Sequence, residues 1–180
     1  MKKIFLISIL VLSTVFLASC AVTVPALMKI DREDAEALCF LGHVYGGAFD
    51  SVVNYDQAIK CYTRAAEMGH PVAQYYLGNI YFQGKGVSVD YKLALKWYSR
   101  SAARGNAPAQ CALGIMSWEG QGVPLDYELG EIWFSESAAS GYAPAQYCLG
   151  YLYTQGKGVS IDWAQMHIYN PGKHLDRWHT

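Results

Sequence analysis

The chain has 180 residues, of which 52% are hydrophobic, 14% aromatic and only 16% charged. That composition supports one domain with a sizeable apolar core and excludes a disordered chain. Its 14 basic and 15 acidic side chains leave a formal net charge of −1, so no basic excess is available for phosphate backbones. Nucleic acid is therefore not an expected partner.

The N-terminus is organised like an export signal. Lys2 and Lys3 precede an apolar run over residues 4–17, and small residues follow it. A positive segment, a short hydrophobic segment and small residues at the cut site are the three parts of a secretory signal. We therefore expect residues 1–19 to be a signal peptide and residues 20–34 to form an anchor and linker.

The segment Leu17-Ala18-Ser19-Cys20 resembles the lipobox of bacterial lipoproteins. The resemblance implies that Cys20 is lipidated, and two or more acyl chains give stable anchoring to a bilayer. Ala21, where Asp often marks retention in the inner membrane, implies the periplasmic face of the outer membrane. The alternative is an uncleaved inner-membrane signal anchor, because residues 4–28 contain no charged side chain and are long enough to span a bilayer.

The rest of the chain repeats itself with a period of 36 residues. Leu-Gly pairs mark the register: Leu41-Gly42, Leu77-Gly78, Leu113-Gly114 and Leu149-Gly150. A Gly-x-Gly-Val turn and an Asp-aromatic pair follow in the same register, with Asn54-Tyr55 in place of the Asp pair in the first unit. A period of this length indicates stacked structural repeats.

Each unit is predicted to be two antiparallel helices. In the second unit, apolar residues four apart (Ala73, Leu77 and Tyr81) predict a first helix over 72–82. The glycines at 84 and 86 should end that helix. Asp90 is the expected N-cap of a second helix over 91–104, and Gly105 is its expected left-handed end.

The pattern Ala-x-x-x-Leu-Gly-x-x-Tyr-x-x-Gly-x-Gly-Val, followed by Asp-x-x-x-Ala-x-x-Trp-Tyr, resembles the Sel1-like repeat family, relatives of the tetratricopeptide repeats. The resemblance implies an all-α fold: an α-solenoid, or αα-superhelix, of about four two-helix repeats over residues 35–170. The expected units are 35–70, 71–106, 107–142 and a truncated 143–170. Pro171-Gly172 should stop the last helix, which leaves residues 171–180 as an irregular tail.

No catalytic motif is present. The sequence contains no Ser-x-x-Lys, Gly-x-Ser-x-Gly or His-Glu-x-x-His, and its glycine–lysine segments at 78–85 and 150–157 have the wrong spacing for a phosphate loop. His167, His174 and His179 do not align on one helix face. We expect no enzyme activity, no cofactor and no metal site.

Four cysteines follow Cys20, and none forms a Cys-x-x-Cys pair. Some cysteine-rich members of the Sel1-like family bridge the two helices of a unit, and only Cys39 and Cys61 lie within one unit in a way that allows this. An oxidising compartment permits such a disulfide. Buried free thiols that pack as small hydrophobic residues are the favoured alternative.

The first helices of tetratricopeptide-like units line the concave side of the solenoid. Residues on this side that vary between units are the candidate partner-binding residues: Phe40, His43, Tyr76, Asn79, Gln83, Ile115, Glu119, Tyr151 and Gln155. Aromatic and amide side chains with little net charge suit a protein or peptide partner.

The sequence therefore predicts an exported, membrane-anchored scaffold or adaptor at the cell envelope, which binds a protein or peptide on its concave face. Two alternatives stay open. One is an envelope hydrolase or glycan-binding protein, for which only Glu36 and Glu119 supply carboxylates on that face. The other is a degenerate, largely structural paralogue, which the truncated fourth unit suggests.

Overall fold

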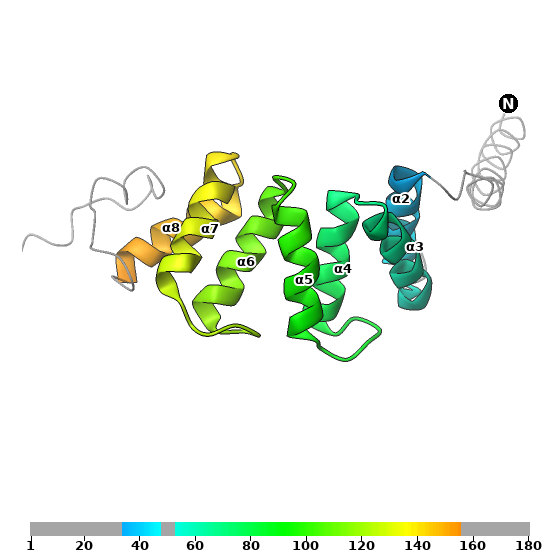
Figure 1. Ribbon diagram of the computed structural model, residues 1–180, viewed down its shortest axis with the longest axis horizontal. Helices are drawn as coiled ribbons and strands as arrows, with labels where there is room; N and C mark the ends of the chain where they lie inside the picture. The colour runs from blue at the N-terminus through cyan, green and yellow to red at the C-terminus, as the bar shows by residue number, and fades with distance from the viewer. Residues whose placement is uncertain (1–33, 48–52, 156–180) are drawn as a thin grey trace, which may run out of the picture.

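The described part of the chain is a row of paired α-helices (Figure 1). This computed structural model describes residues 34–47 and 53–155, which contain seven helices and no strand. They are α2 (Ala35–Tyr45), α3 (Tyr55–Glu67), α4 (Pro71–Gln83), α5 (Tyr91–Ala102), α6 (Ala107–Glu119), α7 (Tyr127–Ala139) and α8 (Ala143–Gln155). The prediction of an all-α repeat solenoid is confirmed.

The helices pack in chain order as the pairs α2–α3, α4–α5 and α6–α7, and α8 packs on α7 as the first helix of a further unit. The expected signal peptide, Cys20, nearly all of the linker, the second helix of the truncated unit and the tail lie outside the described residues.

Side-chain caps set where the helices begin. The N-caps of α2 to α7 are Asp34, Asn54, His70, Asp90, Asn106 and Asp126, and each side chain accepts a hydrogen bond from a backbone N–H of the first turn. Asp90 Oδ1, for example, accepts from the N–H of Leu93 at 2.9 Å, which confirms its predicted role. An N-cap of this kind stabilises a helix by about 1 kcal/mol.

The helix ends follow the glycines only in part. Gly84 and Gly120 end α4 and α6 in the left-handed conformation, with φ of 68° and 69°. However, α5 ends at Ala102, two residues before the expected end at 104. The reason is that the N–H of Gly105 bonds back to the carbonyl of Ala102 at 2.8 Å, so the turn starts ahead of the glycine.

A glycine facing an aromatic ring sets the distance between the two helices of each unit. A Cβ added to Gly42, Gly78 or Gly114 would lie 2.5, 2.6 or 2.6 Å from a ring carbon of Tyr62, Tyr98 or Phe134, respectively. These separations are well inside van der Waals contact, so only glycine permits this approach. The contact explains why the Leu-Gly pair recurs at every step of the period.

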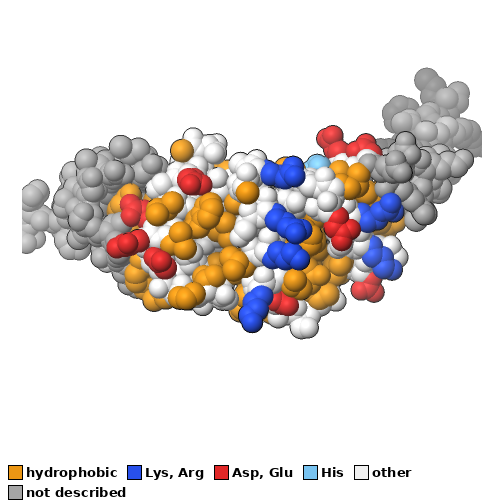
Figure 2. Space-filling view, viewed as in Figure 1, with side chains coloured by type: hydrophobic (Ala, Val, Ile, Leu, Met, Phe, Trp, Pro, Cys, Tyr) orange, Lys and Arg blue, Asp and Glu red, His pale blue; other side chains and the backbone are white. Residues whose placement is uncertain are grey.

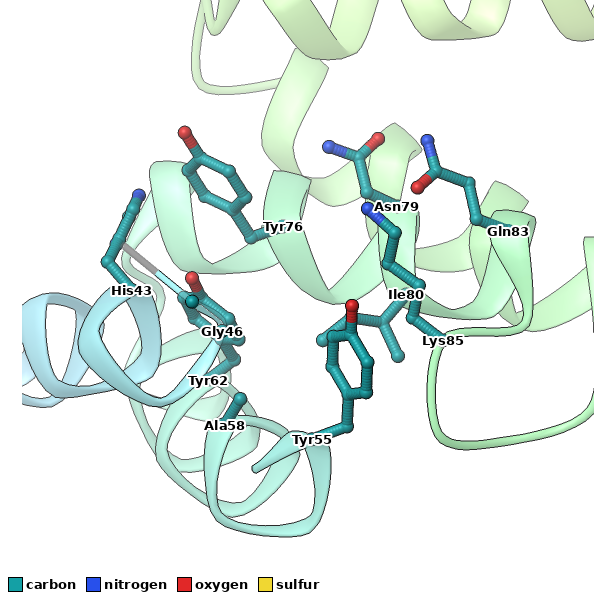
Figure 3. A pocket seen from close by; sticks show the side chains of 11 residues that line it. His43, Gly46, Tyr55, Ala58, Tyr62, Tyr76, Asn79, Ile80, Gln83 and Lys85 are labelled. Carbon is teal, nitrogen blue, oxygen red and sulfur yellow. The ribbon is translucent and has the colours of Figure 1, made fainter. Parts of the chain in front are cut away.

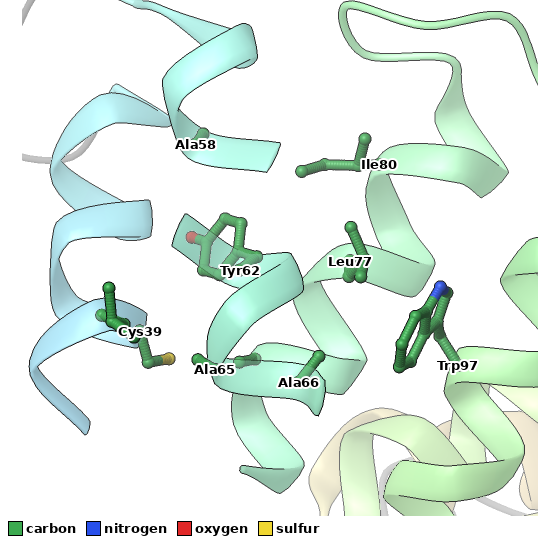
Figure 4. Close-up of a cluster of buried hydrophobic side chains, with 10 residues drawn as sticks. Cys39, Ala58, Tyr62, Ala65, Ala66, Leu77, Ile80 and Trp97 are labelled. Carbon is green, nitrogen blue, oxygen red and sulfur yellow. The ribbon is translucent and has the colours of Figure 1, made fainter. Parts of the chain in front are cut away.

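The leucines of the last three Leu-Gly pairs are buried at the junctions between units. Leu77, Leu113 and Leu149 are at most 3% exposed. Figure 4 shows Leu77 and Ile80 of α4 facing Tyr62 and Ala66 of α3 on one side, with Trp97 on the other. The core is therefore a series of clusters, each shared by neighbouring helices, rather than one central core.

Two sets of polar side chains tie the helices together. Within a unit, Ser101 Oγ donates to the Pro71 carbonyl at 2.6 Å, and Ser137 Oγ repeats this bond 36 residues later to the Ala107 carbonyl at 2.7 Å. Between units, Gln74 Nε2 donates to the Ala66 carbonyl at 2.9 Å. Such bonds satisfy the buried donor groups of these side chains and fix the position of one helix against the next.

The glycine–aromatic contact can be tested with Gly114→Ala. The added methyl group would overlap the ring of Phe134. We expect the free energy of unfolding to fall by about 1–3 kcal/mol, although alanine is the better helix former. Urea unfolding followed by circular dichroism measures this change. In a Phe134→Leu background the same glycine substitution should cost less, and an equal cost in both backgrounds would contradict the proposed constraint.

Candidate functional site

Two neighbouring cavities lie along the first helices of the units. Their volumes are about 320 Å³ and about 220 Å³. Asn79 and Gln83 of α4 line both cavities, so the two hollows adjoin at this helix. We call the combined hollow the α4 groove; it extends from α2 and α3 on one side to α6 and the start of α8 on the other.

The first cavity has a wall of packed aromatic rings. Tyr62 and Tyr76 stack at 5.5 Å between ring centroids with an interplanar angle of 11°, and His43 meets Tyr76 edge-on at 4.1 Å. Figure 3 shows these three side chains together on the side opposite Gln83. His43 Nδ1–H also donates to the Cys39 carbonyl at 2.9 Å, which holds the imidazole in place. The wall is therefore a preorganised apolar surface.

Asn79 is oriented by a buried tyrosine. The hydroxyl of Tyr98 donates to Asn79 Oδ1 at 2.7 Å. Burial raises the pKa of the Tyr98 hydroxyl well above its usual value, so this group stays a donor at neutral pH. Because the amide oxygen accepts this bond, the amide nitrogen of Asn79 presents its N–H groups to the groove.

The second cavity joins residues of three successive units. Tyr75 and Phe82 come from α4, Ile115 from α6 and Pro144 from the start of α8, and Tyr142 lies in the turn just before Pro144. The pKa of Tyr142 is raised by burial and then by nearby Tyr75, which places its hydroxyl close to α4 despite the distance in sequence. A ligand here would contact several units at once.

Five of the nine predicted partner-binding residues line the α4 groove: His43, Tyr76, Asn79, Gln83 and Ile115. The other four, Phe40, Glu119, Tyr151 and Gln155, are exposed and are not among the residues that line it. Tyr151 lies beside the ring of Trp118, at 6.1 Å between centroids. Contact of these nine residues with a partner stays a prediction.

Four aromatic residues that line the second cavity were not among the predicted partner-binding residues: Tyr75, Phe82, Tyr98 and Tyr142. For Tyr142 a signal was present. It occupies the position held by the N-caps His70 and Asn106 in the preceding units, where an aromatic residue has no capping function. A large ring where a cap is expected points to a separate packing role.

The cysteine expectations need one correction. All four described cysteines are free thiols, including Cys39 and Cys61. Cys111 and Cys148, which belong to different units, pack in one cluster and share a side-chain hydrogen bond. The sequence prediction considered only cysteine pairs within one unit, whereas this pair forms between the first helices of successive units.

The thiols differ in acidity. Burial raises the pKa of Cys39 to about 11, and burial also raises the pKa of Cys61. The hydrogen bond between Cys111 and Cys148 raises the pKa of Cys111 and lowers that of Cys148, because the Cys111 thiol donates to the Cys148 sulfur and stabilises its thiolate. Cys148 is therefore the most acidic of the described thiols.

The α4 groove has little charge. Of the described residues that line it, Lys85 alone carries a permanent charge. Within residues 34–47 and 53–155 no three His, Cys, Asp or Glu side chains are grouped so that they could hold a metal ion. In the same ranges no helix combines the length and apolar character needed to cross a bilayer.

Comparisons with known proteins agree with this architecture. A family model described as Sel1 repeat matches residues 35–70, 71–106, 107–142 and 143–162. A search of curated proteins returns no match.

Solved structures also match. A protective antigen of uropathogenic Escherichia coli with an SLR fold is 34% identical, with a TM-score of 0.71, and the match covers 75% of this chain and 29% of the antigen. A Sel1 repeat protein from Oxalobacter formigenes is 29% identical, with a TM-score of 0.71 and coverage of 77% and 57%. Helicobacter pylori cysteine rich protein B is 23% identical, with a TM-score of 0.54 and coverage of 67% and 92%, and supports the fold alone.

Alkylation at neutral pH tests the acidity of the thiols. Because the thiolate is the nucleophile and the pKa of Cys148 is lowered, we expect iodoacetamide to modify Cys148 before the other described cysteines. Time-resolved peptide mass spectrometry measures the order. Cys61 is the internal control, since it is also partly exposed but its pKa is raised. Modification of Cys61 at an equal or faster rate would contradict the hydrogen-bond assignment.

Proposed function

The chain belongs to the Sel1 repeat family, and from that premise we propose that it is a non-catalytic scaffold whose α4 groove holds an extended peptide segment of a partner protein. Sel1 repeat proteins generally act in protein–protein interaction and are typically not enzymes. The observation that carries the proposal is the pair of adjoining cavities that share Asn79 and Gln83.

The spacing of the two amides favours an extended peptide. Asn79 and Gln83 are four residues apart on α4, so they project from one face of the helix (Figure 3). Helix positions four apart lie about 5–6 Å from each other, and alternate residues of an extended chain are about 6.5 Å apart. Two amides at this spacing can bond alternate peptide groups of one bound strand.

The walls of the groove favour apolar side chains and a neutral or acidic charge on that peptide. Tyr62, Tyr76 and Phe82 offer large ring surfaces at little cost in conformational entropy. Lys85 is the single permanent charge among the described lining residues, so a basic peptide would meet repulsion and an acidic one attraction.

We propose that a lipid attached to Cys20 anchors this scaffold at the cell envelope. The lipobox-like segment at 17–20 supports a lipid anchor at the periplasmic face of the outer membrane. The groove would then present the partner peptide close to that membrane.

Photo-crosslinking in living cells tests the groove. A photo-reactive amino acid that replaces Gln83 would lie at both cavities. This replacement removes none of the contacts described above. We expect a discrete adduct whose mass exceeds that of this chain, and mass spectrometry of it identifies the partner. The control position is Lys60, exposed on α3. Absence of an adduct at Gln83 in folded protein, or the same adduct at Lys60, would contradict the proposal.

Tyr98→Phe is the matched variant for this experiment. It keeps the buried ring and removes the hydroxyl that orients Asn79. The cost in folding stability should be about 1 kcal/mol, because one hydrogen bond is lost. We expect the Gln83 adduct to fall several-fold while the circular dichroism spectrum stays unchanged. An adduct of undiminished yield would show that Asn79 takes no part in binding.

Cys20→Ala tests the anchor. We expect the wild-type protein to be found in the membrane fraction with the added mass of acyl chains, and the variant to be released or left unprocessed, because the acylated thiol is missing. Fractionation and intact-protein mass spectrometry measure both properties. A membrane-bound wild-type protein without acyl mass would favour the inner-membrane signal anchor.

A further inference from the structure

The second helices of the second and third units carry opposite charges. On α5, Lys92, Lys96 and Arg100 are four residues apart, and Arg104 continues the row just beyond the helix end. All four are exposed, and α5 contains no acidic residue. We call these residues the basic row.

The equivalent positions of α7 have the opposite character. The residues 36 positions after the first three members of the basic row are Glu128, Ile132 and Glu136. Helix α7 contains no basic residue. The two glutamates are exposed, and Ile132 is 56% exposed. We call these three residues the acidic row. Figure 2 shows Lys and Arg side chains over the middle of the molecule and Asp and Glu but no Lys or Arg side chains over the α7–α8 end, whereas the α2–α3 end carries both kinds.

Helix stability does not explain the basic row. Like charges four residues apart on a helix repel each other and cost a few tenths of a kcal/mol per pair. Lys96 and Arg100 are nevertheless held side by side, because Lys96 Nζ and Arg100 Cζ lie 5.6 and 5.0 Å from the centroid of the Trp97 ring. The row is thus a positioned surface that lacks a counter-charge on its own helix.

We propose that α5 and α7 together form an interface with a second copy of this chain. The twofold axis of this dimer lies between the two helices and parallel to them. It brings the α5 of each copy over the α7 of the other, so each contact occurs twice.

The 36-residue period sets the register of this interface. Equivalent residues of α5 and α7 are the same number of residues from their N-caps, Asp90 and Asp126, because the units are repeats of one another. Lys92 therefore faces Glu128 of the second copy, and Arg100 faces Glu136. Lys96 lays its aliphatic stem over Ile132. An axis perpendicular to the helices would instead place the basic row on the basic row, so the charge pattern selects a single arrangement.

The charged and the apolar residues contribute differently to the free energy of dimerisation. Exposed ion pairs contribute only about 0–1 kcal/mol each, so four of them give orientation rather than strong affinity. Ile132 and Leu129, at 56% and 39% exposure, supply apolar area at the centre of the contact. The dimer should accordingly be weakened by salt, because exposed charges are screened. The α4 groove lies along the first helices, so a dimer formed through α5 and α7 leaves the groove accessible to a partner peptide.

Charge reversal tests the interface in the full-length chain. Two differently tagged copies are co-expressed, extracted in mild detergent and purified by one tag, and the second tag is quantified. The basic-row variant carries Lys92→Glu with Arg100→Glu, and the acidic-row variant carries Glu128→Lys with Glu136→Lys. We expect wild-type copies to purify together. When both copies carry the same variant, the amount of the second tag recovered should fall about tenfold, because like charges then oppose each other.

The decisive sample combines the two variants. In that pair both contacts again join opposite charges, so co-purification should return to near the wild-type level. Lys60→Glu with Arg64→Glu on α3 is the matched control, since it makes the same change in charge on an exposed helix outside the interface and should have no effect. Circular dichroism confirms that every variant is folded. The proposal is overturned if wild-type copies do not purify together, if the mixed pair fails to recover, or if the α3 control behaves like the basic-row variant.

Discussion

The close approach of a glycine to an aromatic ring is the constraint on which this solenoid depends. Gly42, Gly78 and Gly114 let the second helix of each unit lie against the first at a distance that a single added methyl group would forbid. With that distance repeated, Leu77 and Leu113, which precede two of these glycines, are buried in the same way. Equal spacing of the units then lines up the α4 groove on the first helices and the charged rows on the second.

Tyr98 connects this packing to the candidate binding site. One edge of its ring lies against Gly78, and its hydroxyl orients Asn79 at the boundary between the two cavities. The side chain that fixes the helix distance therefore also fixes the direction of an amide in the groove. The second unit consequently holds both this packing contact and the boundary between the two cavities.

The sequence predicted the fold well, because the 36-residue period, the glycines and the capping residues act locally. It placed five of nine candidate residues in the groove for the same reason: periodicity determines which face of a helix a residue occupies. It did not reveal that Tyr142 and Tyr75 line one cavity, or that Cys148 packs near Cys111, since both arrangements depend on the rotation of one unit relative to another. That rotation arises from the summed packing of whole helices, and no local pattern encodes it.

The recurrence of packing contacts at steps of 36 residues has an evolutionary consequence. Duplication of one 36-residue segment would reproduce the glycine–aromatic contact, the buried leucine and the serine bond without altering any existing junction. An insertion of another length within a helix would move the following residues of that helix to a different face. Genes of this kind can therefore lengthen or shorten by whole units and so change the length of the solenoid, while each inherited unit keeps its internal contacts.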